Sequence, residues 1–567
     1  MKLPALKGGA SRKGNFLLYI VSLPACRQAG RDTCRSRRDP LSCWPMTEQH
    51  KITKAATTIG IGTLLSRILG FLRDVVIANF FGTGMAADAF FVAFRLPNLW
   101  RRLVGEGSMA ISFIPIYTEY LTTRSEKESK ELTHIAFTLA GTLLAILTIL
   151  GIVFAPLLVR IIAPGWVGKF PESFQLTVTL SQVIFPYIFF MGLFALAMGI
   201  LNSRRHFFAP SFAPVFLNIC MILSVLLFFF HLKPPVLTLA FGVLAGGLLQ
   251  FLFQIPFLLK KGITFRFNFD VRHPAVRRIG LLMVPGLIGT AVYQLNVFVD
   301  TIFASFLPRG SVSYLYYADR LMEFPLGVFA VAMGMAALPS FSELASRGRK
   351  EELSETVSFA FRLVSFISVP ALVGLIALKT PIINLLFQRG VFDEHATQMT
   401  SRALLCYCVG LWAIAGVRTV VPAFYALQDT KTPLKIGVVC LVANVVLIAA
   451  LIVPLQHAGL ALATSLSSIL NLVLLSRELR KALGKIDFRK NIKTLMRHFA
   501  CSAPMGLAAY LICSSGDWTQ SGRSLPKLFL LMIGIVVGAG VYLVCSYCTK
   551  DEEMLFLLKM VKRKRRP

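Results

Sequence analysis

Arginines and carboxylates interrupt apolar segments that are long enough to cross a membrane, near residues 68, 100 and 329. The cations deep in these segments are Arg67, Arg73, Arg95, Arg101, Arg102 and Arg320. The carboxylates at comparable depth are Asp74, Glu106, Asp319 and Glu323. An arginine at the centre of a bilayer costs at least about 2.5–3.5 kcal/mol, so several of these must pair or face water. The surplus of cations predicts a hydrated cavity for an anionic substrate, and forked guanidinium donors suit phosphate in particular.

The first segment, "LSRILGFLRDVV" (65–76), carries two stripes of polar side chains. Arg67 and Asp74 are seven residues apart and share a helix face, so we expect Asp74 to orient Arg67. Ser66 and Arg73 form the adjacent stripe. This helix is therefore predicted to form one wall of the cavity.

The second segment, "DAFFVAFRLPNLWRRLVGEG" (88–107), repeats charged side chains at intervals of seven. Its main stripe consists of Asp88, Arg95 and Arg102, and around that stripe lie Asn98, Arg101 and Glu106. Pro97, Gly105 and Gly107 allow this helix to bend or break.

The third segment, "YYADRLMEFPLGV" (316–328), places Asp319 and Glu323 four residues apart on one face, beside Arg320. An alternative interpretation is that the charges form internal ion pairs that only hold the helix bundle together. The pairs in that interpretation are Arg67–Asp74, Arg102–Glu106 and Arg320–Glu323.

Composition indicates an all-α polytopic membrane protein. The chain has 567 residues, of which 55% are hydrophobic, and a mean hydropathy of +0.68. We expect fourteen transmembrane helices, centred near residues 68, 100, 146, 188, 220, 247, 290, 329, 368, 412, 444, 468, 506 and 537. The eleven cysteines show no paired spacing in a loop, so neither disulfides nor a cysteine metal site is expected, and CSYC (545–548) should only pack.

The loops between these segments sort by charge. Alternate loops hold 31 Lys and Arg residues on one side of the membrane and six on the other, which predicts that both termini are cytoplasmic. The net charge of +31 therefore reflects topology rather than nucleic-acid binding. The basic end, "VKRKRRP" (561–567), fits a contact with anionic lipids. Residues 1–45 differ in character from the helical sequence that begins at Met46, and we expect a non-native or disordered extension there, with a signal peptide as the alternative.

Weak internal similarity indicates two parallel repeats. Residues 197–218 align without gaps with 423–444 at an offset of 226, and two shorter matches lie at offsets of 225 and 224. Two six-helix lobes around a central cavity are typical of an alternating-access transporter, with the substrate at the lobe interface. The expected units are an N-lobe (46–260), a basic linker (261–278), a C-lobe (279–483), a basic loop with a C-terminal helix pair (484–549) and a basic tail (550–567).

Four stretches resemble the MurJ (MviN) lipid II flippase family of the multidrug/oligosaccharidyl-lipid/polysaccharide exporter superfamily. They are "SRILGFLRD", "ADAFFVAFRLPNLWRRLVGEGS", "ADRLMEFPLGVFAVAMGMAALPSFSEL" and "ALQDTKTP". The resemblance implies a bacterial inner-membrane protein that moves lipid II, the undecaprenyl-pyrophosphate-linked disaccharide-pentapeptide, to the periplasmic leaflet for peptidoglycan synthesis. The family's important arginines match Arg67, Arg73, Arg101 and Arg320. The neighbouring motif positions are Ser66, Asp74, Asp88, Asn98, Arg102, Glu106, Asp319 and Glu323.

We expect such a flippase to make and break no covalent bond and to need no cofactor. Its cycle could couple to membrane potential or to a monovalent cation, for which Asp300, a buried carboxylate without an evident partner, is the candidate site. Cell-wall synthesis proteins are candidate partners. A drug antiporter coupled to a cation should have an acidic cavity, whereas a flippase for another polyprenyl-pyrophosphate oligosaccharide fits the charges equally well. An enzyme is disfavoured, because no D-x-D motif occurs and the eight histidines are dispersed.

Overall fold

The computed structural model describes residues 46–103, 109–484, 487–520 and 524–564, and within them the chain is helical and has no strand. The expectation for residues 1–45 lies outside these ranges. The first ten helices are α1 (Met46–Phe81), α2 (Met85–Trp100), α3 (Met109–Thr123), α4 (Glu126–Val153), α5 (Ala155–Ile162), α6 (Pro164–Lys169), α7 (Pro171–Ile184), α8 (Pro186–Ser203), α9 (Phe208–Phe228) and α10 (Leu237–Lys260).

The second half of the chain continues in the same way. Its helices are α11 (Pro274–Ala304), α12 (Ser311–Pro325), the π-helix η4 (Leu326–Ala330), α13 (Val331–Ser346), α14 (Lys350–Ala377), α15 (Lys379–Phe387), α16 (Glu394–Ala426), α17 (Lys431–Leu455), α18 (His457–Leu483), α19 (Phe488–Ser514), α20 (Leu525–Cys548) and α21 (Glu552–Lys564). The helix α11 begins at Pro274, so the last residues of the expected linker are helical.

Nine spans in the described part of the chain are long and apolar enough to cross a membrane. They are formed by α4, by α7 with α8, and by α9, α10, α14, α16, α17, α18 and α20. The helices α1, α2 and α12 are not among them; α2 and α12 have 16 and 15 residues and are shorter than the 18 residues that such a span needs here. The all-α membrane class is confirmed, and the number fourteen stays a prediction.

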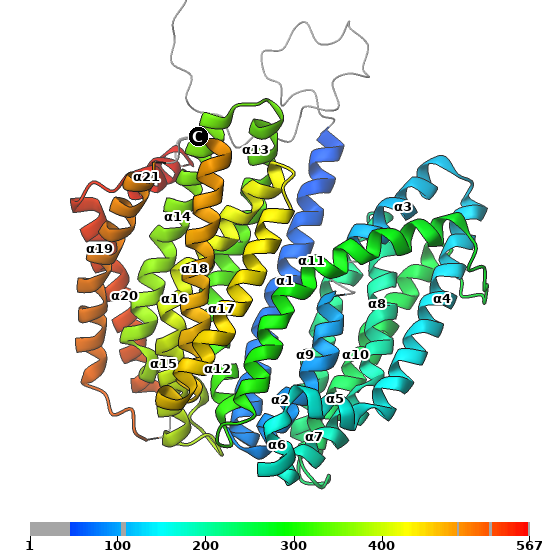
Figure 1. The fold of residues 1–567 in the computed structure, drawn as a ribbon, viewed down its shortest axis with the longest axis horizontal. Coiled ribbons are helices and arrows are strands. Elements are labelled where there is room, and N and C mark those ends of the chain that lie inside the picture. Colours follow the sequence, from blue (N-terminus) through cyan, green and yellow to red (C-terminus); the bar gives the residue numbers. More distant parts are fainter. Residues whose placement is uncertain (1–45, 104–108, 485–486, 521–523, 565–567) are drawn as a thin grey trace, which may run out of the picture.

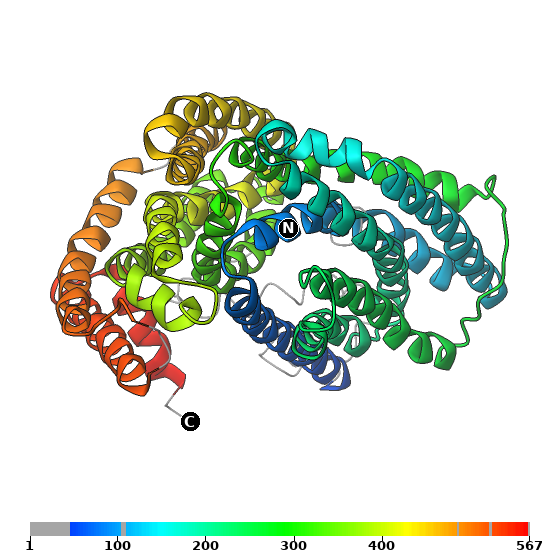
Figure 2. The same cartoon turned by 90° about the horizontal axis from the view of Figure 1, so that it is seen from below.

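The helices form two groups that converge at one end of the molecule (Figure 1). The helices α2, α6 and α7 lie there near α12 and α15, and we call this the joined end; the groups diverge toward the end where α1 begins, the terminal end. The helix α11 crosses between the groups and contacts α3 as well as α17 and α18. Figure 2 shows α19, α20 and α21 on the outer side of the second group, consistent with an appended pair.

Aromatic packing fills the joined end and connects the two lobes. The rings of Phe91 and Tyr316 stack with centroids 3.8 Å apart, and Tyr317 contacts Phe387 and Phe392. Both tyrosines lie in α12, whereas Phe91 lies in α2. This apolar contact between the lobes positions the charged residues described below.

The internal repeat is visible in the turns that follow α8 and α16. The backbone N–H of His206 donates to Leu201 and that of Asp429 donates to Phe424, which is the same helix-ending bond 223 residues apart. The alignment at an offset of 226 is therefore three residues out of register at these turns. It holds further along, because Asn218 and Asn444 each bond the first helix of their lobe, α1 and α11. About one extra helical turn separates the C-lobe turn from its asparagine.

The helix of the second segment continues through Pro97 and departs from regular α-helix only near the end of the segment. The chain changes from α-helix to π-helix at residues 101–103, whereas Gly105 and Gly107 lie outside the described ranges. The π-helix η4 occupies the corresponding place in the C-lobe, between α12 and α13. π-helical turns inside α-helices occur frequently at functional sites.

Candidate binding site between the two lobes

Asp74 is the residue on which the charged side chains converge. Its carboxylate oxygen Oδ1 accepts from Arg73 Nη2 at 2.7 Å and Nε at 3.1 Å, and Oδ2 accepts from Arg320 Nε at 2.9 Å. The hydroxyl of Tyr316 also donates to Oδ1, at 3.1 Å. Asp74 and Arg73 belong to α1, whereas Tyr316 and Arg320 belong to α12. One buried carboxylate therefore joins two arginines from different lobes.

Arg73 is held on several sides. Its Nη1 donates to Asn218 Oδ1 at 3.2 Å, and its Nη2 donates to the Tyr316 hydroxyl at 3.3 Å. Asn218 in turn donates to the backbone carbonyl of Ser66, at 3.1 Å. Ser66 thus enters the network through its backbone. Because Arg73 is only 6% exposed, its guanidinium is fixed before any substrate arrives.

Arg320 is the more accessible of the two arginines. Its side chain is 35% exposed, its guanidinium lies over the Tyr316 ring, and its contact with Glu323 is long at 3.9 Å. The neighbouring Asp319 is half-buried and lies within electrostatic range of Glu323 and Arg102. Arg320 therefore keeps donors that an incoming anion could use while its Nε stays on Asp74.

Arg67 occupies a different place from the one expected. Asp74 does not bond it, because seven residues along a helix is about 10 Å, and the Asp74 oxygens are bound by Arg73 and Arg320 instead. The Arg67 guanidinium lies against the π-helix η4 of the other lobe, where a Cβ on Gly327 would come within 2.8 Å of Nη1. Among the described residues Arg67 makes no ion pair, and its side chain is exposed. It is thus a cation between the lobes that remains available to an anion.

The remaining predicted residues of α2 divide into two sets. Arg101 lies just beyond α2, and its Nε donates to Asn98 Oδ1 at 3.0 Å. Arg102 is half-buried, and Glu106 lies outside the described residues. Arg95 instead donates to the Val297 carbonyl at 3.0 Å and to the Thr301 hydroxyl, both on α11. Arg95 therefore links α2 to α11.

Asp88 caps the first turn of α12 at the joined end. Its oxygens accept from Gly310 N at 2.5 Å, Ser313 N at 2.8 Å and Ser313 Oγ at 2.5 Å, and the residue is 3% exposed. A carboxylate at a helix N-terminus satisfies orphan N–H groups and is favoured by the helix dipole. Although the seven-residue stripe places Asp88 in line with Arg102, the structure places it in the contact that holds the lobes together.

Close backbone approach completes the joined end. Gly165 N donates to Ser305 Oγ at 3.0 Å, and a Cβ on Gly165 would come within 2.5 Å of the Ser305 carbonyl oxygen. Val391 N donates to the Asn79 carbonyl at 3.0 Å, beside Gly390, which has a φ of +57°. A side chain larger than hydrogen at Gly165 would separate the lobes here.

Asp300 has two neutral partners that the sequence did not reveal. Asn444 Nδ2 donates to it at 3.2 Å and the Thr464 hydroxyl at 3.4 Å, from α17 and α18. The Asn444 carbonyl oxygen is buried and has no hydrogen bond in the described part of the chain. Arg95 lies within electrostatic range of Asp300, and the unused Asn444 oxygen beside the carboxylate is of the type that ligates hard cations.

Two residues of the network were missed by inspection of the sequence. Tyr316 stands four residues before Arg320, a spacing that puts the two on one helix face. Asn218 aligns with Asn444 in the repeat, and a repeated polar residue in two apolar helices is the signal that could have revealed it.

The family model described as "Lipid II flippase MurJ" matches residues 77–529. A probable lipid II flippase MurJ from Vibrio cholerae serotype O1 is 36% identical over 516 residues, covering 89% of this chain and 98% of the relative. A lipid II flippase MurJ from Burkholderia cenocepacia is 38% identical over 432 residues, covering 76% and 84%.

Solved structures give the same relationship. A lipid II flippase MurJ in an inward closed conformation has a TM-score of 0.73 at 29% identity, covering 87% of this chain and 99% of that one. An inward-facing multidrug resistance MATE family transporter of the MOP superfamily has a TM-score of 0.63 at 15% identity, covering 76% and 98%. The second likeness is one of fold alone.

Proposed function

The chain belongs to the lipid II flippase MurJ family, and from this premise we propose that it moves lipid II from the cytoplasmic to the periplasmic leaflet by alternating access. The observation that carries the mechanism is the convergence of Arg73 and Arg320 from opposite lobes on Asp74. A pyrophosphate offers the same arginines more acceptor oxygens and more negative charge than one carboxylate. Its arrival would compete with Asp74 and weaken the bond between the lobes.

The four predicted arginines would then have distinct tasks. Arg67 is exposed and without an ion pair among the described residues, so it would meet the anion first. Arg320 would offer its unused guanidinium donors, and Arg101, held by Asn98, would contact the head group from the α2 side. Arg73 would act as a fixed positive charge behind them. The polyprenyl tail would stay in lipid while sugar and peptide occupy the hydrated space.

The direction of the cycle follows from the loop charges. The terminal end carries the start of α1, and the basic residues Arg204, Arg205 and Lys431 lie at the turns that follow α8 and α16; we assign this end to the cytoplasm. The joined end is then periplasmic, and the structure represents a state closed on that side. Separation of the joined end would expose the head group to the periplasm without making or breaking a covalent bond.

The rival functions differ in the charge of the site. A drug antiporter of the same superfamily would need anionic groups for cationic substrates, whereas the accessible groups here include Arg67 and Arg320. A flippase for another polyprenyl-pyrophosphate oligosaccharide would use the same arginines, and family membership favours lipid II over it.

The function is tested by expressing the chain in a bacterium depleted of its own lipid II flippase. We expect growth to be restored and lipid II to become accessible to a membrane-impermeant probe in the outer leaflet. In vesicles that contain the purified chain, lipid II should be translocated faster than a polyprenyl-pyrophosphate with an unrelated oligosaccharide. Equal rates for the two lipids would favour the rival flippase, and no rescue together with no translocation would contradict the proposal.

We propose in addition that Asp300 binds a monovalent cation with Asn444 and Thr464. Replacing Asp300 with asparagine should lower Na⁺ affinity at least about tenfold, because the carboxylate supplies the only formal charge among these three side chains. The measurement is the thermal stabilisation of purified protein by NaCl against choline chloride at equal ionic strength. Asp270→Asn, on the exposed linker, should behave as the wild type. Equal Na⁺ stabilisation of the wild type and Asp300→Asn would contradict this site.

A further inference from the structure

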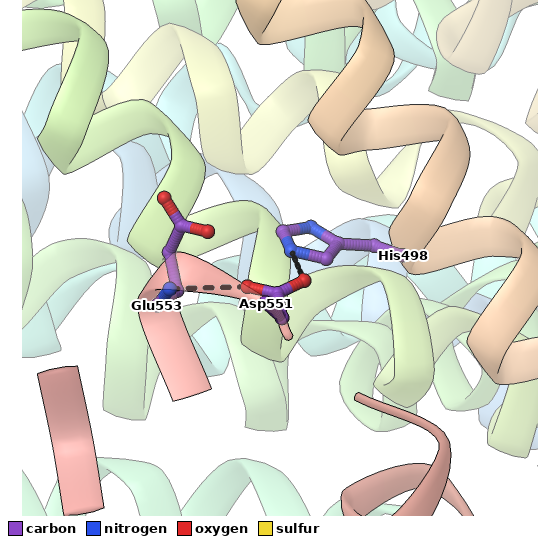
Figure 3. A group of neighbouring side chains, drawn as sticks. All are labelled: His498, Asp551 and Glu553. Atoms are coloured by element: carbon purple, nitrogen blue, oxygen red, sulfur yellow. Dashed lines mark hydrogen bonds and ion pairs between the residues drawn. The ribbon is translucent and has the colours of Figure 1, made fainter. Parts of the chain in front are cut away.

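A second group of titratable side chains lies far from the lobe interface, where the C-terminal helices meet α14. His498 comes from α19, Asp551 from the turn after α20 and Glu553 from the first turn of α21. All three are buried, and one ligand atom from each lies within 4.8 Å of the others. Figure 3 shows them at one place, with the imidazole edge turned toward Asp551. The lipid pathway proposed above uses none of them.

The inner atoms of this group lack normal hydrogen bonds. His498 Nε2 lies 3.1 Å from Asp551 Oδ2, yet neither atom has a hydrogen bond of acceptable geometry, and neither does His498 Nδ1. Buried polar atoms are almost always bonded, so three exceptions at one place need an explanation. Two ligands at about 2.0–2.1 Å from one tetrahedral metal ion are themselves separated by about 3.3 Å. The observed 3.1 Å is close to that spacing, and it is also within the range of an ordinary N–H···O distance.

The outer atoms of the carboxylates are, by contrast, held firmly. Glu553 Oε1 accepts from Arg362 Nε at 2.7 Å, and Asp551 Oδ1 accepts from the backbone N–H of Glu553 at 3.0 Å. Arg362 is itself held by Asn491, at 3.3 Å. One oxygen of each carboxylate is therefore bound by a group outside this cluster. The second oxygen of each is left to bind an ion between the three side chains. Metal ligands are oriented by outer partners in this way.

The charges of the group also call for a further cation. Two buried carboxylates face one guanidinium, that of Arg362, so one negative charge is left without compensation. One proton, on His498 or between Asp551 and Glu553, would neutralise the group, whereas a divalent ion would leave one positive charge in excess beside Arg362. The orphaned Nε2 and Oδ2 favour a metal, because a protonated imidazole should direct its N–H along a hydrogen bond to the carboxylate.

We propose that His498, Asp551 and Glu553 bind one divalent transition-metal ion of the Zn²⁺ class. One imidazole nitrogen and two carboxylate oxygens are ligands that Zn²⁺ accepts, whereas Mg²⁺ and Ca²⁺ prefer oxygen alone. The ion ties α19 to the start of α21, and Arg362 links this clip to α14 of the C-lobe. It thereby fixes the appended helix pair to the body of the transporter.

The test uses the full-length chain purified without a histidine tag, stripped with a chelator and then supplied with Zn²⁺ or Co²⁺. We expect one ion per chain by elemental mass spectrometry, and visible absorption from bound Co²⁺ with an N/O ligand set. His498→Gln and Asp551→Asn should each weaken Zn²⁺ binding at least about 100-fold, more than the loss of an outer partner causes. His231→Gln, at an exposed turn, is the matched control and should bind as the wild type does.

Thermal unfolding provides the second readout. Removing Zn²⁺ should lower the Tm of the wild type and leave the Tm of Asp551→Asn unchanged. This comparison can be interpreted even if His498→Gln does not fold. If the wild type retains no ion, or if both variants retain it, the metal site is wrong and the group is an ion-pair network with a protonated His498. Because no lipid is present, this result is independent of the proposed translocation.

Discussion

Replacing Arg320 with alanine should abolish lipid II translocation while the protein stays at its normal level in the membrane. The substitution removes the Nε bond to Asp74 at 2.9 Å and the free donors proposed to hold pyrophosphate. Each charge-assisted hydrogen bond contributes about 1.5–3 kcal/mol, so the loss of two should slow translocation at least about 100-fold. The side chain is 35% exposed, so its removal leaves only a small cavity.

The experiment measures growth and outer-leaflet lipid II in depleted cells, with the amount of each variant determined in parallel. Arg320→Lys keeps the charge and loses the fork, and we expect it to restore only part of the activity. Arg309→Ala is the matched control, since it also removes an arginine paired across the lobes, with Glu172 at 3.1 Å, but at an exposed position. Normal translocation by Arg320→Ala at wild-type abundance would contradict the cationic site.

Asp74→Asn separates the two tasks assigned to Arg320. If the only role of Arg320 is to pair with Asp74, then Arg320→Ala, Asp74→Asn and the variant that carries both substitutions should lose equal activity. If Arg320 also binds pyrophosphate, Arg320→Ala should be the more severe, because Asp74→Asn frees both arginines for the substrate. Arg73→Ala is less informative, since that side chain is buried and its loss leaves Asp74 and Asn218 without partners.

The sequence was sufficient to predict the all-helical membrane class and to identify the charged residues within the helices. Apolar length predicted spans such as α16 and α17, and the sequence showed that α1 and α2 carry charged side chains. Periodicity describes only one helix at a time, however. It paired Arg67 with Asp74 because they share a face, whereas Asp74 binds Arg320, which is 246 residues away in the sequence.

Contacts between distant helices account for the other differences. In the sequence Asp88 is one member of a charged stripe. Its role as the cap of α12 could not be predicted, because it depends on how the two lobes meet. The partners of Asp300 and the approach of Gly165 to Ser305 also join distant segments. His498 and Asp551 are 53 residues apart, so the dispersed pattern of the histidines did not indicate that these two side chains meet. The repeat was the one pattern that carried such information, through Asn218 and Asn444.

Replacing Asp88 with asparagine should shift the protein toward the state that is open at the joined end. The carboxylate accepts three hydrogen bonds from Gly310 and Ser313, and an amide must present its NH₂ group to one of these donors. The loss of a charge-assisted bond in a buried place, about 1.5–3 kcal/mol, predicts a shift of about 10- to 150-fold. Ser313→Ala removes one of these bonds and keeps the charge and the other two, so its shift should be smaller than that of Asp88→Asn.

Spin labels at positions 172 and 309, which lie on opposite lobes at the joined end, measure this shift as a distance distribution. The longer distance should dominate for Asp88→Asn. Gly165→Val tests the same closure sterically, because its side chain would meet the Ser305 backbone, and it should produce the same long distance without any change of charge. A long distance for Gly165→Val and an unchanged one for Asp88→Asn would show that packing alone holds the joined end. Unchanged distances in both would mean that neither contact controls the lobes.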